Sequence, residues 1–308
     1  MTSAFMPLPQ MTAPSPEPTR FQRIYGVVRV APFFLLHLAC FVSVFYVAPT
    51  TTALILCVSL YVVRMFGITA GFHRYFAHRA YKTSRPFQFV LAWIGTSAMQ
   101  KGPLWWAGHH RHHHKYSDQE GDPHSPVINS VWWSHVGWIL SRRYDKDILN
   151  SIRDFASYPE LRILNKFHWV PGFLLAGVCY WIDGLSGLVW GFLVSTILLY
   201  HGTFLVNSLC HVLGRKRYVT GDESRNNVFA AIVTLGEGWH NNHHCYQSSA
   251  NQGFFWWELD ISYTTLRVLS LFGLVWGLRK PPLEKLEAMR IQTGAQMVVP
   301  QPEPERTV

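Results

Sequence analysis

The sequence predicts an all-α integral membrane protein with four transmembrane helices in two hairpins and a helical cap on the cytoplasmic side. Three observations predict this fold class. Apolar runs occur in two pairs, charged residues make up only 15% of the 308 residues, against about 25% in soluble proteins, and histidines crowd into the polar segments that follow each pair. An aromatic content of 15% excludes a disordered or collagen-like chain.

The first pair of apolar runs predicts one helical hairpin. The runs cover residues 31–47 and 52–72 and are separated by a short turn at 48–51. At about 1.5 Å per residue, the second run covers the ~30 Å hydrocarbon core of a bilayer. Arg64 is the one charged residue in that run. We therefore expect two spans that pack as a tight hairpin.

The second pair predicts another hairpin. Its runs cover 169–182 and 185–210, around a turn at Asp183 and Gly184. Two further apolar stretches, 87–99 and 266–278, are too short to span and predict interfacial or buried helices. The alternative is a soluble protein with four core helices. It is disfavoured because near-continuous apolar runs leave no polar face for solvent.

The placement of charge predicts the orientation. The turns at 48–51 and 183–184 carry no Lys or Arg, and none lies between Lys166 and Arg215. The positive-inside rule then places both termini and both histidine-rich segments in the cytoplasm. A net charge of +9 suits an anionic membrane face, and we expect no nucleic-acid partner.

The chain is expected to hold one membrane domain between two disordered ends. Residues 1–24 are rich in Pro, Ser and Thr and lack the apolar core of a signal peptide, so they predict a disordered lead. The membrane domain covers 25–280, with cytoplasmic segments at 73–165 and 211–263. Residues 281–308 predict a disordered C-terminal tail.

Histidines form three clusters that predict a metal site. The first holds His73 and His78, and the other two share a His-x-x-His-His core: His110, His113 and His114, then His240, His243 and His244. Positions i, i+3 and i+4 share one face of a helix, so each core is expected to aim three imidazoles at one region. His73 and His78 are about 140° apart on an α-helix, so they converge only where the helix ends or unwinds.

The ligand chemistry favours two metal ions. Imidazole suits Zn, Cu, Fe or Ni, and eight clustered histidines plus His211 are too many for one ion of four to six ligands. The chain has no His-Glu-x-x-His, which weakens a zinc protease interpretation. A carboxylate-bridged bundle needs two Glu-x-x-His motifs, and only Glu237 with His240 fits. Neutral ligands beside a membrane suggest oxygen chemistry on a lipid.

These residues resemble the membrane-bound, histidine-box fatty acid desaturases, specifically the stearoyl-CoA (Δ9) desaturase-like branch. The resemblance covers roughly residues 25–280, and it rests on five stretches: GITAGFHRYFAH ending at His78, WAGHHRHHHKYS from Trp106, DPH at Asp122, NSLCH at Asn207 and GEGWHNNHH ending at His244.

By this resemblance, two iron ions bind nine histidines, and Asn207 holds a water on one iron. The nine are His73, His78, His110, His113, His114, His211, His240, His243 and His244. The implied activity is O2-dependent introduction of a cis double bond, at Δ9, into a saturated long-chain acyl group. The implied electron source is an external donor such as ferredoxin or a cytochrome b5-type protein.

The resemblance leaves the acyl carrier open between CoA and a membrane lipid. The animal acyl-CoA enzymes carry an Arg, which contacts CoA, where this chain has Gly108. The third box looks more like the acyl-lipid and plastid-type members. Arg142 and Arg143 nevertheless follow Trp138-Ile-Leu, as a basic pair does in the CoA-using enzymes.

Aromatic residues are the candidates for the walls and the end of an acyl tunnel. Trp105, Trp106, Trp239 and Phe72 lie beside the boxes. Tyr61, on the second span and four residues after Cys57, is the candidate for the end of the tunnel, because it lies ~18 Å along a helix from His73. Ordinary core packing of these side chains is the competing interpretation.

Two other functions compete with this one. A hydroxylase or related di-iron oxygenase would carry the same boxes, because box spacing does not determine the reaction outcome. A metal transporter or sensor would need ionisable ligands near the middle of the spans. The spans offer only His37, Arg64 and His201, with no central Asp or Glu.

Overall fold

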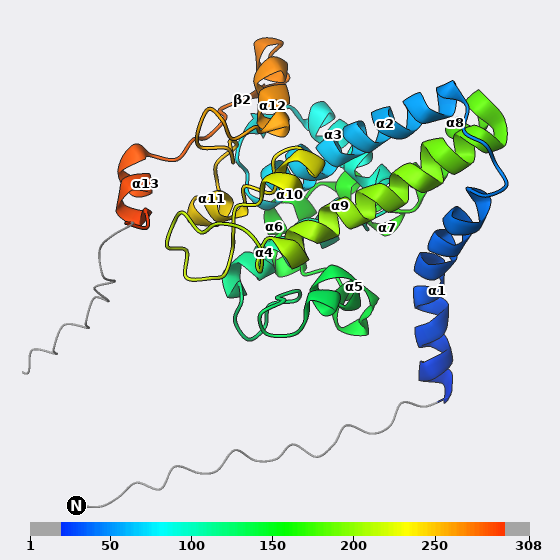
Figure 1. Cartoon of the computed structure of the whole chain (residues 1–308), viewed down its shortest axis with the longest axis horizontal. Coiled ribbons are helices and arrows are strands. Elements are labelled where there is room, and N and C mark those ends of the chain that lie inside the picture. The colour runs from blue at the N-terminus through cyan, green and yellow to red at the C-terminus, as the bar shows by residue number, and fades with distance from the viewer. Residues whose placement is uncertain (1–19, 293–308) are drawn as a thin grey trace, which may run out of the picture.

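The computed structural model describes residues 20–292 of the chain (Figure 1). Its long apolar elements are α1 (Arg20–Ser43), α2 (Thr51–Phe66) with the π-helix η1 (Gly67–Ala77), and α8 (Val170–Ser186), the π-helix η5 (Gly187–Val194) and α9 (Ser195–Leu209).

The shorter elements build the cap. Two strands, β1 (Lys82–Thr83) and β2 (Val275–Trp276), pair antiparallel with Thr83 opposite Val275. The helices are α3 (Arg85–Ser97), α4 (Pro103–Tyr116), η2 (Trp133–Gly137), α5 (Trp138–Leu140), η3 (Arg142–Tyr144), η4 (Leu149–Ser151), α6 (Arg153–Ala156), α7 (Pro159–Lys166), α10 (Val228–Val233), α11 (His240–Cys245), α12 (Ile261–Leu271) and α13 (Leu283–Met289).

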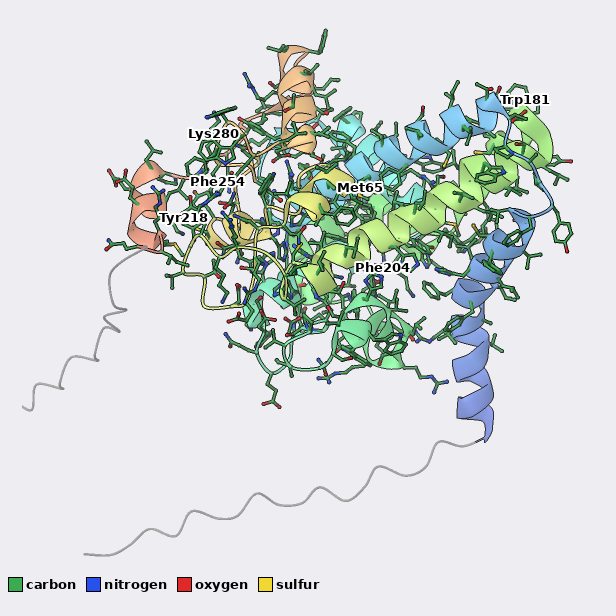
Figure 2. The ribbon with its side chains drawn as sticks, in the orientation of Figure 1. Met65, Trp181, Phe204, Tyr218, Phe254 and Lys280 are labelled. Carbon is green, nitrogen blue, oxygen red and sulfur yellow. The ribbon has the colours of Figure 1, made fainter. Side chains whose placement is uncertain are left out.

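Two helical stretches are long and apolar enough to cross a membrane, Thr51–Ala77 and Val170–Leu209. The second stretch is two helices, because Asp183 and Gly184 have non-helical backbone angles. Cys179 on one arm lies against Gly187 and Gly191 on the other, so the chain reverses at the predicted turn. Trp181 projects at the end of this hairpin remote from the cap (Figure 2). The two long apolar helices indicate membrane association, and four separate spans stay a prediction.

The first hairpin is more open than expected. α1, whose apolar part Val28–Ser43 is shorter than the other two stretches, diverges from α2 in Figure 1 and contacts η5. The turn after α1 is held by Trp190, whose indole N–H donates to the Val47 carbonyl at 2.8 Å. α1 leaves large apolar side chains such as Phe34, Leu38 and Phe41 exposed. A tight α1–α2 pair is therefore wrong, because this helix keeps apolar surface for lipid.

The core of the cap forms where η1 and α9 end. η1 packs against α3 and α4, and Phe72, Phe76 and Phe155 belong to one buried cluster there. The apolar stretches at 87–99 and 266–278 are helical as expected over α3 and α12, although the second continues into β2.

The two ends of the chain differ in part from the expected disorder. α1 begins at Arg20, inside the predicted lead, and residues 1–19 lie outside the described residues. The helix α13 lies inside the predicted tail, which is therefore ordered at 283–289. Residues 293–308 lie outside the described residues.

Candidate metal centre

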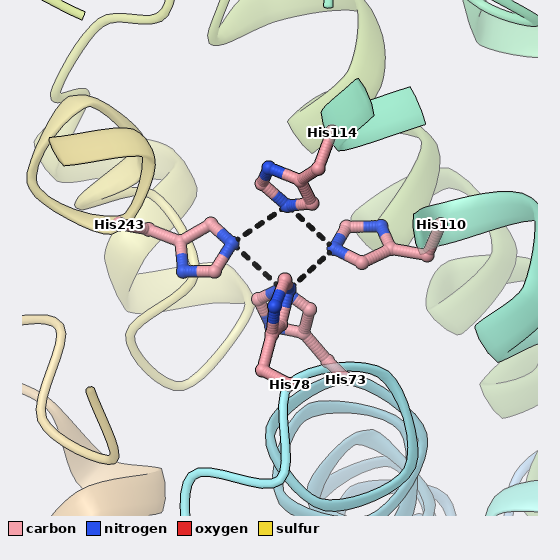
Figure 3. A group of neighbouring side chains, drawn as sticks. All are labelled: His73, His78, His110, His114 and His243. Atoms are coloured by element: carbon pink, nitrogen blue, oxygen red, sulfur yellow. Dashed lines mark hydrogen bonds between the residues drawn. The ribbon is translucent and has the colours of Figure 1, made fainter. Parts of the chain in front are cut away.

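The structure brings the eight box histidines and His211 together as two adjacent groups. Group one, shown in Figure 3, holds His73, His78, His110, His114 and His243. Group two holds His113, His211, His240 and His244. Within each group the candidate ligand atoms all lie within 4.8 Å of one another. The histidines come from η1, α4, α11 and the residues that follow η1 and α9, so the site joins both His-rich segments.

A π-helix brings the two histidines of the first box together. His73 lies in η1 and His78 follows it, and the His78 N–H donates to the His73 carbonyl at 3.1 Å. This i to i+5 bond is the pattern of a π-helix, and it stacks residues five apart. The two imidazole rings are consequently 4.8 Å apart between centroids. The second span therefore widens at its end, one of the two ways in which the box could converge.

Each His-x-x-His-His core divides its histidines between the groups. On α4, His110 and His114 join group one while His113 joins group two, and on α11 His240 and His244 join group two while His243 joins group one. The three imidazoles of each core do lie in one region, but within it they divide between two adjacent groups. Positions i+3 and i+4 differ by about 100° around a helix, which is enough to serve two neighbouring ions.

The geometry of the nitrogen atoms fits metal ions. In group one, successive Nε2 atoms lie 2.9 to 3.1 Å apart (Figure 3). Metal–nitrogen bonds of about 2.1 Å place ligands at right angles about 3 Å apart. In group two, the buried Nε2 atoms of His113 and His244 have no hydrogen-bond partner among the described residues. Converging lone pairs of this kind are satisfied by cations, so the residues fit two ions.

Carboxylates contact the Nδ1 edge of several histidine rings. The Nδ1 atom of His113 lies 3.0 Å from Asp122, that of His211 lies 2.8 Å from Asp118, and that of His244 lies 2.6 Å from Asp222. In group one, a Glu237 oxygen lies against His73 Nδ1, and the same carboxylate pairs with Arg74. An acceptor on Nδ1 directs the Nε2 lone pair to the metal and raises its basicity. The sequence did not indicate these four as partners, although Asp122 and Glu237 stand in matched stretches.

Electrostatics keep most of these imidazoles neutral. Burial, followed by the repulsion of neighbouring rings, lowers the pKa of His78, His110, His114, His240 and His243 well below the usual value. Burial also lowers the pKa of His244, to about 4, against the pull of Asp222. Neutral imidazole is the form that binds metal.

His113 is the exception among them. Burial alone would lower its pKa, but the Asp122 carboxylate outweighs burial and raises it.

An apolar cavity of about 870 Å³ reaches His110 of group one. At one end it is lined by Trp105, Trp106, His110, His124 and Asn207. At the other it runs between α1, α8, η5 and α9, where the lining includes Phe33, Leu188 and Phe192. The Trp106 ring stacks on His110 with centroids 5.0 Å apart. The cavity therefore connects a metal ligand with the lipid-facing helices, and we call it the acyl cavity.

Several predicted substrate contacts lie elsewhere. Among the described residues that line the acyl cavity, Tyr61, Phe72, Trp239, Arg142 and Arg143 do not occur. The Tyr61 hydroxyl donates to the Val233 carbonyl at 2.7 Å, and the Trp239 indole donates to Leu259 at 2.9 Å. Phe72 is fully buried in the cap core, and Arg142 and Arg143 are exposed on η3. None of these five residues lines this cavity, which passes along α9 and not α2, so their contacts with a substrate stay predictions.

A polar pair of side chains in the cavity wall was not predicted from the sequence. Gln100 donates its amide N–H to the Thr203 hydroxyl at 2.7 Å, and both residues line the acyl cavity. The pair joins the loop before α4 to α9 next to the metal end. Neither residue belongs to a histidine box, so the sequence carried no signal for it.

Comparison with known proteins decides the family. The family model described as fatty acid desaturase matches residues 49–268. The chain belongs to the fatty acid desaturase family. It is therefore an O2-dependent oxidoreductase that acts on fatty acyl chains, and the buried histidine groups are the metal site of such an enzyme. This assignment excludes the metal transporter or sensor.

The relatives of this desaturase differ in the bond that they attack. It is 38% identical over 229 residues, 73% of each chain, to the acyl-CoA C20 Delta5-desaturase of Anemone leveillei. It is 39% identical over 209 residues, 68% of this chain and 76% of the relative, to the sn-1 stearoyl-lipid 9-desaturase of Anabaena variabilis. It is 35% identical over 283 residues, 88% of each chain, to the Delta-9 acyl-lipid desaturase 2 of Arabidopsis thaliana.

Proposed function

We propose that this desaturase introduces a cis double bond at Δ9 into a saturated long-chain acyl group carried on CoA or on a membrane lipid. The observation that carries the proposal is the acyl cavity that ends at His110 beside two buried histidine groups. The names of the Anabaena and Arabidopsis relatives support Δ9, and the Anemone relative is the reason to test Δ5.

We propose that each histidine group holds one iron ion. The ligands are the five histidines of group one and the four of group two, and Asn207, which lines the cavity, positions a water on one ion. Iron supplies the O2 chemistry that removes hydrogen from an unactivated C–H bond, which acid–base side chains cannot do.

The protein's own contribution is position and exclusion of water. The apolar cavity holds the acyl chain in place before reaction. The entropy cost of ordering the chain is therefore met on binding and not at the reacting carbons. Trp106 lies flat against His110 and forms the cavity wall at the metal end, so the chain must pass this ring. The carboxylates on His113, His211 and His244 fix the orientation of these rings, so that their Nε2 atoms would be held ready to bind the metal.

The charge distribution supports an orientation with both termini and the metal centre in the cytoplasm. The turns at 48–51 and 183–184 carry no Lys or Arg, so both fit the opposite face of the bilayer. In this arrangement α1, α2 with η1, α8, and η5 with α9 are the four spans. An external donor, ferredoxin or a cytochrome b5-type protein, delivers electrons from the cytoplasm.

Expression with fatty acid analysis tests the proposal. A host culture that expresses the chain should gain a monounsaturated fatty acid, and gas chromatography of derivatives that mark the double bond should place it at Δ9. His113→Ala should abolish this product. His112→Ala, at the neighbouring position, should keep activity within about threefold, because the His112 ring bonds the Gly121 carbonyl, packs on Tyr116 and belongs to neither metal group.

Three outcomes would contradict the proposal. A double bond at Δ5 would overturn the regiospecificity alone. A hydroxylated product would make the chain a hydroxylase on this centre. Full activity of His113→Ala with two irons per chain would overturn the ligand assignment.

A further inference from the structure

The side chain of Arg111 fastens the end of η1 to α4. Arg111 stands between His110 and His112 in the second box. Its Nε donates to the Ala77 carbonyl at 2.8 Å, and its Nη2 donates to the Phe76 carbonyl at 2.7 Å. One guanidinium on α4 therefore holds two successive carbonyls at the end of the π-helix.

These two carbonyls are left without a backbone donor where η1 ends. The three preceding carbonyls, at residues 73–75, accept the N–H groups of residues 78–80. Among the described residues, no backbone N–H donates to the carbonyls of Phe76 and Ala77, and both residues are buried. A buried carbonyl without a donor costs free energy, and the negative end of a helix dipole favours a cation. Arg111 meets both requirements.

A carboxylate on α6 holds the Arg111 guanidinium in place. Asp154 accepts from Nη1 and from Nη2 of Arg111, each at 3.0 Å, and such parallel bonds fix the plane of the guanidinium. The same carboxylate accepts from Arg79 at 3.0 Å. Arg79 is the second residue after η1, and its φ of 49° is one that non-glycine residues rarely adopt. Strain of this kind persists where the surroundings fix it, and here Asp154 holds both arginines.

The helix η1 serves one metal group and not the other. Its box histidines, His73 and His78, belong to group one, whereas group two takes its ligands from α4, α11 and the segment after α9. A π-helical turn is rare and short, so it depends on support from its surroundings. His78 follows Ala77 directly, and its Nε2 lies 3.0 Å from that of His110. The position of His78 therefore depends on where the end of η1 is held.

We propose that Arg111 is a positioning residue that fixes the π-helical end of η1 and thereby the ligand geometry of group one, whereas group two does not depend on it. The inference rests on the proposed function in one respect, that each histidine group holds one iron ion. The Arg111 guanidinium bonds carbonyls and a carboxylate, so it acts on His78 through the backbone. Without it, two carbonyls lose their donor and His78 is free to move away from His73 and His110.

Arg111→Gln tests the proposal through metal release. A Gln side chain is shorter and has one NH2 group, so it cannot hold both carbonyls and Asp154. Iron is withdrawn from the loaded enzyme with increasing ferrozine, a chelator of ferrous iron, and the iron that remains is measured by elemental analysis. One iron per chain should leave at a chelator concentration at least tenfold lower than in the wild type. The other should leave within twofold of the wild-type concentration.

The matched control removes an arginine–carboxylate pair of the same kind. Arg85 donates to both oxygens of Glu160, each at 2.8 Å, and so joins α3 to α7. Arg85→Gln breaks this pair without removing a donor from the carbonyls of η1. Both irons should then leave within twofold of the wild-type concentrations.

Double variants show which iron is loosened. His113→Ala removes a ligand of group two alone, so together with Arg111→Gln it should leave no iron at a chelator concentration where each single variant keeps one. His78→Ala removes a ligand of group one, so together with Arg111→Gln it should still keep one iron, because both changes act on the same group. A merely structural role of Arg111 would instead loosen both irons in the single variant.

A second variant keeps the test valid if Arg111→Gln does not fold. Asp154→Asn leaves the guanidinium in place and weakens its hold, so the first iron should leave at a chelator concentration about threefold lower. Wild-type release from both variants would overturn the inference. So would joint loss of both irons, or loss of the iron of group two. A wild type that binds fewer than two irons would instead contradict the proposed function.

Discussion

At the residue scale, the carboxylates behind the histidines are as decisive as the ligands. Asp122 accepts from His113 Nδ1 through both oxygens at 3.0 Å and is itself fully buried. The Asn side chain of Asp122→Asn has only one oxygen that can accept from this Nδ1–H. Its NH2 group can face the His113 ring instead, where two donors would then oppose each other. We expect metal affinity to fall 10- to 100-fold, seen as loss of about one iron per chain by elemental analysis.

A surface carboxylate provides the control for that prediction. Glu160 bonds Arg85 and lies outside both metal groups, so Glu160→Gln should keep both irons. Equal iron in Asp122→Asn and the wild type would show that the carboxylate does not support the ligand.

The same scale shows what histidine spacing can predict. The boxes identified eight of the nine histidines that converge, because a cluster of imidazoles is costly to bury without a metal, and the family resemblance added His211. The spacing of the boxes could not divide the ligands between two groups. Neighbours such as His113 and His114 differ by only about 100° around a helix, so both lie on the face that the spacing predicts. The division depends on where α11 lies against α4, and that is a tertiary contact.

At the element scale, the turn between α8 and η5 depends on one glycine. Gly184 has φ 55° and ψ −140°, a conformation that residues with a Cβ avoid. Gly184→Ala should destabilise the protein by about 1–3 kcal/mol, measured as a lower melting temperature in detergent. Gly177→Ala is the matched control, because Gly177 lies in helical backbone on the same arm and has equally open space around it. It should be neutral or slightly stabilising. Equal melting temperatures of the two variants would contradict this account.

Turns and π-helices differ in how far a sequence shows them. Asp183-Gly184 between two apolar runs predicts a reversal, and the structure confirms it. The π-helix η1 was not predicted as such, because residues 67–77 are buried on every side and show no periodic polar face. Only the five-residue spacing of His73 and His78 indicated that the α-helix could not continue unchanged.

At the scale of the whole molecule, the path of the acyl cavity predicts which residues set chain length. On η5 and α9, the second arm of the α8–α9 hairpin, Leu188 is the lining residue farthest along the chain from Asn207. Leu188→Ala should therefore favour longer substrates. Two more buried methylenes are worth about 1.6 kcal/mol, on the order of tenfold in kcat/KM. Tyr61→Ala should leave the preference unchanged, since its hydroxyl bonds Val233 away from the cavity. Competition between substrates of different acyl length measures the preference of both variants. A changed preference in Tyr61→Ala with an unchanged one in Leu188→Ala would place the end of the cavity on α2.

The metal centre also predicts how stability depends on pH. In the metal-free protein, His78, His110, His114, His240, His243 and His244 have pKa values below the ~6.5 of an unfolded chain. The unfolded state therefore binds more protons below that pH, and stability falls as the pH drops. His113, whose pKa is raised, acts in the opposite direction but is one residue against six.

We expect the melting temperature of the metal-free enzyme to fall between pH 7.5 and 5.5. Each buried imidazole contributes up to ~1.4 kcal/mol per pH unit once the pH is below the unfolded value. Iron-loaded enzyme should melt higher throughout, because bound metal stabilises the folded state alone. A metal-free protein that melts at the same temperature across this range would mean that the imidazoles are not desolvated. The two buried groups would then have to be open to water before the metal binds.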